Sequence, residues 1–395
     1  MTALIDAPIE APGGAPRTPP RWPVVLLILT VGLVSITLGT LVQYALSSWV
    51  YERAHAEYAT AQALATDTAD DYAGLLERAR LTSTQAEELE QVADPAYTDP
   101  AALGSLTDAS DVLASALAHV PDAELAPRLG IVEPDEHAGA PWDRYADAAR
   151  LLEVRELRDG EVVELESGGS ELSAARAAVV DAREAIFVAL AAHGERSLAD
   201  HPSASHQART DVQHAIDQSG GTWGHPEDSA AAFTATVAAI DQLRASHAAE
   251  EARRLEHPLR AEIEAFARSI AAGVDLEFVW AYEVAGLSSD AWYSGTAEFM
   301  TDDDEGWGRI SLTESIEREW RADENARAVV VHEVGHTQVL RDACYAIFTA
   351  EPFGGDHEMW ATAWAIGMGY DLPGSGIEAY GRPTDAQIDA AAGCR

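Results

Sequence analysis

The stretch Val329-Val330-Val331-His332-Glu333-Val334-Gly335-His336 places two histidines four residues apart, with a glutamate directly after the first. Residues i and i+4 of an α-helix lie on one face, so both imidazoles can reach a single metal ion. Glu333 lies about 100° around the helix from His332, where its carboxylate can contact a water molecule on the metal without binding the metal itself. The stretch therefore predicts a helix that carries a metal site.

The overall composition excludes some classes of partner. The chain has 395 residues and a formal net charge of −40. Such acidity argues against nucleic acid, because binding its phosphate backbone needs a basic surface, and against docking on anionic lipid. We therefore expect no nucleic-acid partner.

One apolar segment near the N-terminus is long enough to cross a bilayer. Val24–Leu46 is almost wholly apolar, and a helix of that length spans the membrane core. A cleaved signal peptide has an apolar region of only about 7–15 residues, so we predict a retained transmembrane helix at 23–50. Trp22 and Trp49 stand at its two ends, where interfacial aromatic residues belong. The small-x-small sequence Ala54-His55-Ala56 makes cleavage the alternative.

The charges around this segment predict its orientation. Residues 1–22 are rich in proline, alanine and glycine, which is typical of a disordered tail. The tail carries Arg17 and Arg21, whereas the chain beyond Tyr51 opens acidic. Because positive charge marks the cytoplasmic side, we expect a cytoplasmic N-terminus and an extracellular C-terminal domain. The protein would then be a single-pass protein of the cell membrane.

Residues 51–272 predict a mainly α-helical region that acts as a stalk. Alanine, glutamate and leucine recur there at helical spacing, and the alanine-rich faces favour antiparallel helices that pack closely. Asp159-Gly160 is a two-residue turn signal, so we predict a β-hairpin at 152–166, with a charged helix as the alternative. Pro258 should kink or split the last helix, expected at 227–272.

Composition changes near residue 273, and we expect a separate domain at 273–395. Val274–Val284 alternates between apolar and polar residues, which predicts a half-buried strand. Two further strands, at Thr296–Met300 and Gly308–Thr313, and the motif helix, at about 323–342, are expected to follow.

A hydrolytic zinc site takes three protein ligands and leaves one position for water. His332 and His336 supply two, and the third has to come from further along the chain. Glu358 follows His336 by 22 residues and precedes the apolar, helix-forming run Met359–Met368. We therefore expect Glu358 to begin a second helix that packs against the first.

With these two motifs the sequence resembles the gluzincin branch of the zinc metallopeptidases, which place a third-ligand glutamate on a second helix. The resemblance covers about residues 275–395. It implies one catalytic Zn²⁺ bound by His332, His336 and Glu358. It also implies that Glu333 is the general base, which takes a proton from the zinc-activated water as that water attacks a peptide carbonyl.

Supporting groups are less clearly defined. Thermolysin-like enzymes have an aspartate four residues after the third ligand, but Thr362 stands here, so Asp342 or Asp356 becomes the candidate that orients a ligand histidine. The resemblance also implies that strand 308–313 is the sheet edge on which a peptide substrate lies. Three side chains are candidates for stabilising the oxyanion: His357, Tyr370 and Tyr380.

Asp342 is also a rival third ligand. It stands six residues after His336, where metzincins place theirs. Metzincins need a glycine three residues after the second histidine to turn the chain, and Val339 occupies that position. We therefore expect the motif helix to run on and to carry Asp342 away from the metal.

The two cysteines of the chain, Cys344 and Cys394, both lie near the motif. Outside the cytoplasm they would form a disulfide that ties the C-terminus to the helix after the motif. Two separate buried thiols are the alternative.

Together these patterns predict an α+β protein with an N-terminal transmembrane helix, a mainly α-helical stalk region and a small zincin-like C-terminal domain. That domain would have a short sheet, the H-E-x-x-H helix and a second helix with the third ligand. The predicted function is that of a membrane-anchored, extracytoplasmic zinc endopeptidase acting on a protein or peptide. The alternative is a cell-surface binding or structural helical protein with a degenerate peptidase domain.

Overall fold

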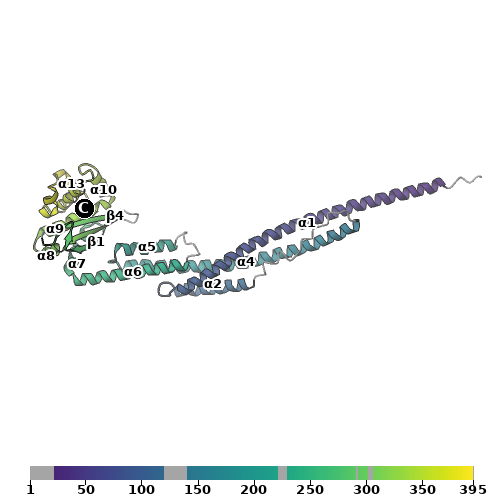
Figure 1. Cartoon of the computed structure of the whole chain (residues 1–395), viewed down its shortest axis with the longest axis horizontal. Helices are drawn as coiled ribbons and strands as arrows, with labels where there is room; N and C mark the ends of the chain where they lie inside the picture. Colours follow the sequence, from purple (N-terminus) through teal and green to yellow (C-terminus); the bar gives the residue numbers. More distant parts are fainter. Residues whose placement is uncertain (1–21, 120–139, 221–228, 291, 301–305, 395) are drawn as a thin grey trace, which may run out of the picture. The chain divides into compact units, whose positions relative to one another are not determined.

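The structure, a computed structural model, describes all residues except 1–21, 120–139, 221–228, 291, 301–305 and 395 (Figure 1). The predicted cytoplasmic tail therefore lies outside the described residues, apart from Trp22. The chain divides into two compact units, 1–80 with 115–175 and 81–114 with 176–395. The domain boundary that we predict at residue 273 lies inside the second unit, and it stays a prediction.

Most of the first unit consists of parts of two long helices. α1 (Trp22–Val92) and α4 (Pro141–Asp200) lie side by side and run in the same direction (Figure 1). Their pairing keeps a nearly constant register: Arg144 donates to Ser48, and Arg158 to Gln62, each 96 residues away. Small and apolar side chains pack between the helices, namely Ala54, Tyr58, Ala148 and Leu151.

The β-hairpin predicted at 152–166 is wrong, because this stretch lies within α4. The turn signal at Asp159-Gly160 is overridden by packing against α1. Leu151, Arg158 and Val162 are buried at helical spacing, and Arg158 lies between Gln62 and Glu161. A methyl group at Gly160 would meet nothing within 4 Å, so this residue lies on the solvent-exposed face of the helix.

In the described part of the chain, α1 is the one helix long and apolar enough to cross a membrane, judged by length and composition. Its apolar residues from Val24 to Leu46 are exposed almost throughout. This agrees with the anchor predicted at 23–50 and equally with a signal sequence.

The helices of the second unit begin with α2 (Pro100–Ala118) and the end of α4. They continue with α5 (His206–Gly220), α6 (Ser229–Glu256) and α7 (Pro258–Ile270). α5 folds back on α6, so that the backbone of Ser205 bonds the side chain of Ser246. The predicted break at Pro258 is confirmed: this residue starts α7, where the missing amide proton costs no helical hydrogen bond.

A three-stranded sheet follows, in the order β1-β5-β4. β1 (Asp275–Ala281) pairs in parallel with β5 (Trp307–Thr313), and β4 (Gly295–Met300) pairs with β5 in antiparallel fashion. The expectation that strand 308–313 forms the substrate-binding edge is therefore wrong, because β5 is the central strand. A sheet edge needs unpaired backbone groups, and β4 supplies one.

The strand predicted at Val274–Val284 is shorter than expected. β1 ends at Ala281, and the remaining residues form β2 (Glu283–Val284), which pairs with β3 (Leu287–Ser288). Ala285 and Gly286, both with positive φ, make the two-residue turn between them. The alternating pattern continues across this break because both segments are extended.

Eight short helical segments complete the second unit. α8 (Glu314–Glu319) leads to α9 (Glu324–Thr337), which carries the motif, and to η2 (Gln338–Leu340). The others are α10 (Asp342–Thr349), α11 (His357–Gly367), η3 (Pro373–Ser375), α12 (Ile377–Tyr380) and α13 (Asp385–Ala392).

The motif helix ends five residues before the predicted residue 342. Side chains of Thr337 and Gln338 donate to the carbonyl of Val334 and thereby occupy an acceptor at the helix end. Arg341 is extended, and a new helix starts at Asp342. Asp342 thus leaves the motif helix through a break, and not by continuation of the helix as we expected.

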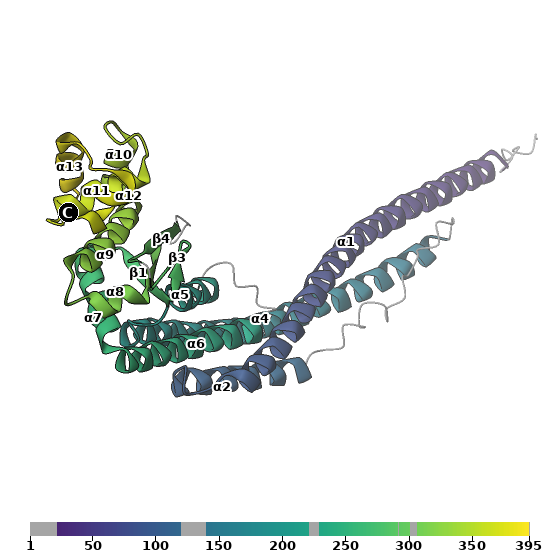
Figure 2. The ribbon, with the colours of Figure 1, turned by 60° about the vertical axis from the view of Figure 1, so that its left-hand side comes forward.

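α9 packs between the sheet and α11 (Figure 2). Gly335 makes the close approach to α11 possible, since a methyl group there would lie 3.1 Å from the backbone of Ala361. The indole of Trp360 donates to the Gly335 carbonyl at 3.0 Å. Trp360 and Trp364 are fully buried and anchor the core of this region.

The predicted disulfide between Cys344 and Cys394 is present, and it joins α10 to the end of α13. Both cysteines are buried. The carbonyl of Cys394 also accepts a hydrogen bond from the indole of Trp364, at 3.0 Å. Cys394 is thereby fixed to α11, the helix that carries Glu358.

Candidate metal centre

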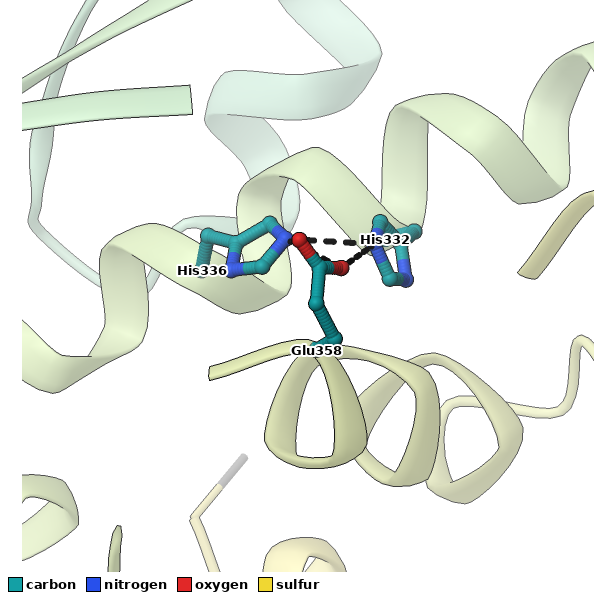
Figure 3. Close-up of side chains that lie close together, drawn as sticks. All are labelled: His332, His336 and Glu358. Carbon is teal, nitrogen blue, oxygen red and sulfur yellow. Dashed lines mark hydrogen bonds and ion pairs between the residues drawn. The ribbon is translucent and has the colours of Figure 1, made fainter. Parts of the chain in front are cut away.

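His332 and His336 of α9 and Glu358 of α11 point at one another (Figure 3). The Nε2 atoms of the two histidines are 3.1 Å apart. Oε2 of Glu358 lies 3.2 Å from Nε2 of His332 and 3.3 Å from Nε2 of His336. In the described part of the chain, this is the one group of three histidine, cysteine, aspartate or glutamate side chains whose ligand atoms all lie within 4.8 Å of one another.

These separations fit a zinc ion. Ligands about 2.0–2.1 Å from a tetrahedral centre are about 3.3 Å from one another, close to the three distances found here. Two imidazole nitrogens and one carboxylate are also a donor set that zinc accepts in hydrolytic sites, which keep a fourth position open. The residues therefore fit the metal that the motif predicts.

The first candidate ligand, His332, is oriented by a backbone carbonyl. Its Nδ1 lies 2.9 Å from the carbonyl oxygen of Ser375, the last residue of η3. Since a carbonyl only accepts, Nδ1 carries a proton, and in the neutral imidazole the lone pair on Nε2 is then the one that can bind a metal. Ser375 thus fills the orienting role that we expected for Asp342 or Asp356.

Asn325, in the first turn of α9, holds the loop that carries this carbonyl. Its Oδ1 accepts from the backbone N–H of Gly374 at 3.0 Å. Its backbone N–H and its Nδ2 donate to Asp323, the N-cap of the same helix, at 2.9 and 3.0 Å. Gly374 lies so close that a methyl group there would be 2.5 Å from the Asn325 carbonyl. The start of α9 and the orientation of His332 are therefore linked through one amide side chain.

Glu333 is buried beside the three ligands. A methyl group at Gly295, the first residue of β4, would lie 2.8 Å from Oε1 of Glu333. Burial raises the pKa of Glu333, positive charge on His332 and His336 opposes this, and Glu358 adds to it. The pKa is raised overall, which suits a carboxylate that accepts a proton and later returns it.

Opposite charges shape the ionisation of two ligands. Burial acts to raise the pKa of Glu358, but hydrogen bonds and positive charge from His332 and His336 hold it well below its usual range. Burial acts to lower the pKa of His332, but the bond to Glu358 and the nearby carboxylates raise it overall. Glu358 and His332 therefore stabilise one another's charged forms.

A cavity of about 740 Å³ opens beside His332 and Glu333. The β2–β3 hairpin, β4, α8 and α12 contribute to its walls. Trp292, Tyr293 and Tyr380 are the aromatic residues in its lining. The cavity gives a substrate group direct access to the candidate general base.

Of the three oxyanion candidates, Tyr380 lies at the site. Its ring stacks on the imidazole of His332, with centroids 5.9 Å apart and planes 9° from parallel. Burial and the negative charges of Glu358 and Glu333 raise its pKa, so the hydroxyl keeps its proton. His357 lies at the periphery, with ring centroids 6.4 Å from His336, and Tyr370 packs against the hydrophobic core.

Neither candidate aspartate reaches the cluster. Asp342 is exposed in the first turn of α10 and does not belong to the cluster of His332, His336 and Glu358. Asp356 caps α11, accepting from the backbone N–H of Met359 at 3.1 Å. That cap fixes the start of the helix at His357, one residue before Glu358. Thr362, in place of the usual aspartate, is buried, and its hydroxyl has no hydrogen-bond partner.

Sequence reasoning missed Ser375, Gly295 and Gly376. Ser375 contributes a backbone carbonyl, which leaves no trace in a side-chain pattern. Gly376 has a φ of 96°, and a methyl group there would lie 2.8 Å from Cε1 of His332. The run Pro373-Gly374-Ser375-Gly376 is a turn signal, and it was the one available indication that a tight loop lies here.

Comparison with known proteins gave no match to a protein-family model, to a curated protein or to a solved structure.

Proposed function

We propose that this chain is a membrane-anchored, extracytoplasmic zinc endopeptidase that hydrolyses peptide bonds with an activated water molecule. The observation that carries the proposal is the convergence of two imidazole nitrogens and a carboxylate oxygen at 3.1–3.3 Å, with the buried carboxylate of Glu333 beside them. A zinc site that only staples a fold has no need of such a carboxylate.

Each residue of the site has a role in this proposal. His332, His336 and Glu358 would hold the zinc ion. A bound zinc ion supplies Lewis acidity, which polarises a carbonyl and lowers the pKa of a water molecule to about 7. Glu333 would take the proton from the attacking water and deliver it to the leaving amine. The protonated hydroxyl of Tyr380 would donate to the developing oxyanion.

The free edge of β4 is the candidate binding surface for the substrate backbone. β4 begins at Gly295, against Glu333, and it pairs on one side with β5. An extended peptide adding to its other side by main-chain hydrogen bonds would run past the general base. The cavity next to His332 would then receive a substrate side chain.

The proposed location of the activity rests on three features. The disulfide between Cys344 and Cys394 is typical of an oxidising compartment. The apolar part of α1 would hold the protein in the membrane. The arginines before this segment favour a cytoplasmic N-terminus, which would leave the metal centre outside the cell.

The test uses the full chain in lipid nanodiscs and the pair Glu333→Gln and Glu324→Gln. Both changes remove a carboxylate from α9, but Glu324 is exposed in the first turn and does not line the cavity. Zinc content and cleavage of a mixed peptide library are measured for each.

We expect one zinc per wild-type chain, cleavage that a chelator abolishes, a Glu333→Gln variant that keeps zinc but loses cleavage, and a Glu324→Gln variant that keeps both. Zinc-free wild-type protein, or cleavage that Glu333→Gln leaves unchanged, refutes the proposal. That result would favour the alternative, a helical cell-surface binding or structural protein with a degenerate peptidase domain.

A further inference from the structure

The exposed apolar stretch of α1 ends at the level where α4 begins and packs against it. Up to Leu46 the side chains of α1 are exposed almost without interruption, and Ser47 is the first fully buried residue. Arg144, in the first turn of α4, donates to Ser48, and its guanidinium stands over the ring of Tyr44 at 5.6 Å. α4 therefore begins at the level where the apolar segment of α1 ends.

A highly exposed tryptophan lies at this level on α4. Trp142, the second residue of the helix, is 72% exposed. On α1, Trp49 is 56% exposed, and the guanidinium of Arg53 lies 5.8 Å from its ring. Two tryptophans and two arginines of the first unit thus gather beside one end of the apolar segment.

This composition matches the boundary between hydrocarbon and water. Tryptophan and tyrosine prefer the headgroup level because their rings are apolar with one polar atom, and arginine extends its charge toward phosphate from the same level. An indole with 72% of its surface in water is costly to leave there. Its burial in a lipid interface removes that cost.

We propose that the N-terminal turn of α4 docks in the headgroup region of the bilayer that α1 spans, with Trp142 inserted beside Trp49. The helical pair then has two attachment points on the membrane, one spanning and one interfacial. Two points fix the rotation of the pair about the axis of α1, which a single span does not. The inference rests on α1 being a retained anchor and not on the peptidase activity.

The test places a nitroxide at single cysteines of the full chain in vesicles of phosphatidylcholine. The native cysteines are both in the buried disulfide, so each new cysteine is the one free thiol. The labelled variants are Ala146→Cys, Val163→Cys and Ile36→Cys, so Trp142 is present in all of them. Ala146 is exposed one turn after Trp142 on the same face of α4. Val163 is exposed on the same helix, about 25 Å further along, and Ile36 is exposed in the middle of the apolar segment. Accessibility to oxygen and to a water-soluble nickel chelate is measured at each.

We expect the label at 36 to prefer oxygen strongly, the label at 163 to prefer nickel, and the label at 146 to lie between them at headgroup depth. A label at 146 that behaves like the one at 163, while the label at 36 lies in the bilayer, overturns the docking and leaves the anchor in place. A label at 36 in water, or loss of that segment from the mature chain by mass spectrometry, overturns anchor and docking together.

Discussion

Gly295 of β4 lies directly against the carboxylate of Glu333. A methyl group on Gly295 would be 2.5 Å from Cγ and 2.8 Å from Oε1 of Glu333, closer than side-chain atoms approach one another. The edge strand of the sheet and the candidate general base are therefore in contact across a position that has no side chain. A peptide that adds to β4, as proposed, would therefore lie next to the candidate general base.

Gly295→Ala should move the Glu333 carboxylate while leaving the three ligands in place. We expect peptide cleavage to fall by about a hundredfold, the typical cost of displacing a reacting group by about 1 Å, with zinc content unchanged. The control is Gly104→Ala on α2, where a methyl group meets nothing within 4 Å. Full activity in Gly295→Ala would show that the carboxylate tolerates displacement, and would count against its role as the base.

Asn325→Ala should weaken zinc binding at a distance. The change removes the acceptor for Gly374 N–H and so loosens the loop whose Ser375 carbonyl orients His332. Loss of such orienting groups typically costs about 10- to 100-fold in metal affinity, and we expect a loss in that range by competition with a chromophoric chelator. Glu324→Gln, one residue away, should bind zinc as the wild type does. Unchanged zinc affinity in Asn325→Ala would mean that the hydrogen bond from Gly374 to Asn325 is not needed to orient His332.

Tyr293 should make the free energy of unfolding depend on pH in the alkaline range. Burial, with the hydrogen bond to Asp323 second, raises the pKa of Tyr293 to about 12, whereas an unfolded tyrosine titrates near about 10. The neutral phenol is thus favoured in the folded chain. Its contribution is complete below about pH 10 and is lost as pH rises through about 12.

The measurement is denaturant unfolding of the wild type and of Tyr293→Phe from pH 9 to 12. The difference in the free energy of unfolding between the two should shrink across this window. A constant difference would mean that the phenol does not titrate differently in the two states.

Removing the disulfide should destabilise the second unit considerably. Cys344 and Cys394 close a loop with a sequence separation of 50, for which the chain-entropy relation gives about 4 kcal/mol. We expect the double change Cys344→Ala and Cys394→Ala to lower the free energy of unfolding by roughly that amount. A reductant should destabilise the wild type similarly and leave the double variant unaffected. A loss below about 1 kcal/mol would mean that other contacts already hold this loop closed in the unfolded chain.

Several features follow from local chemistry and were predictable from the sequence. His332 and His336 share a helix face because the helical repeat is fixed by the backbone. Glu358 lies in the first turn of its own helix because Asp356 supplies the cap. Pro258 starts a helix for want of an amide proton. The apolar segment Val24–Leu46 and the pairing of the two cysteines were equally accessible, since both depend on composition.

Only the tertiary structure decided the remainder. Asp159-Gly160 is a turn signal locally, but pairing of α4 with α1 buries Arg158 at helical spacing and prevails over that signal. β5 becomes the central strand because both of its edges find partners, a choice that no pattern within 307–313 records. Ser375 acts through its carbonyl, which every residue has. The orientation of His332 therefore depends on the path by which the chain returns to α9. For this site, the sequence alone determined that His332, Glu333 and His336 lie on one helix, and the tertiary structure decided which group orients His332.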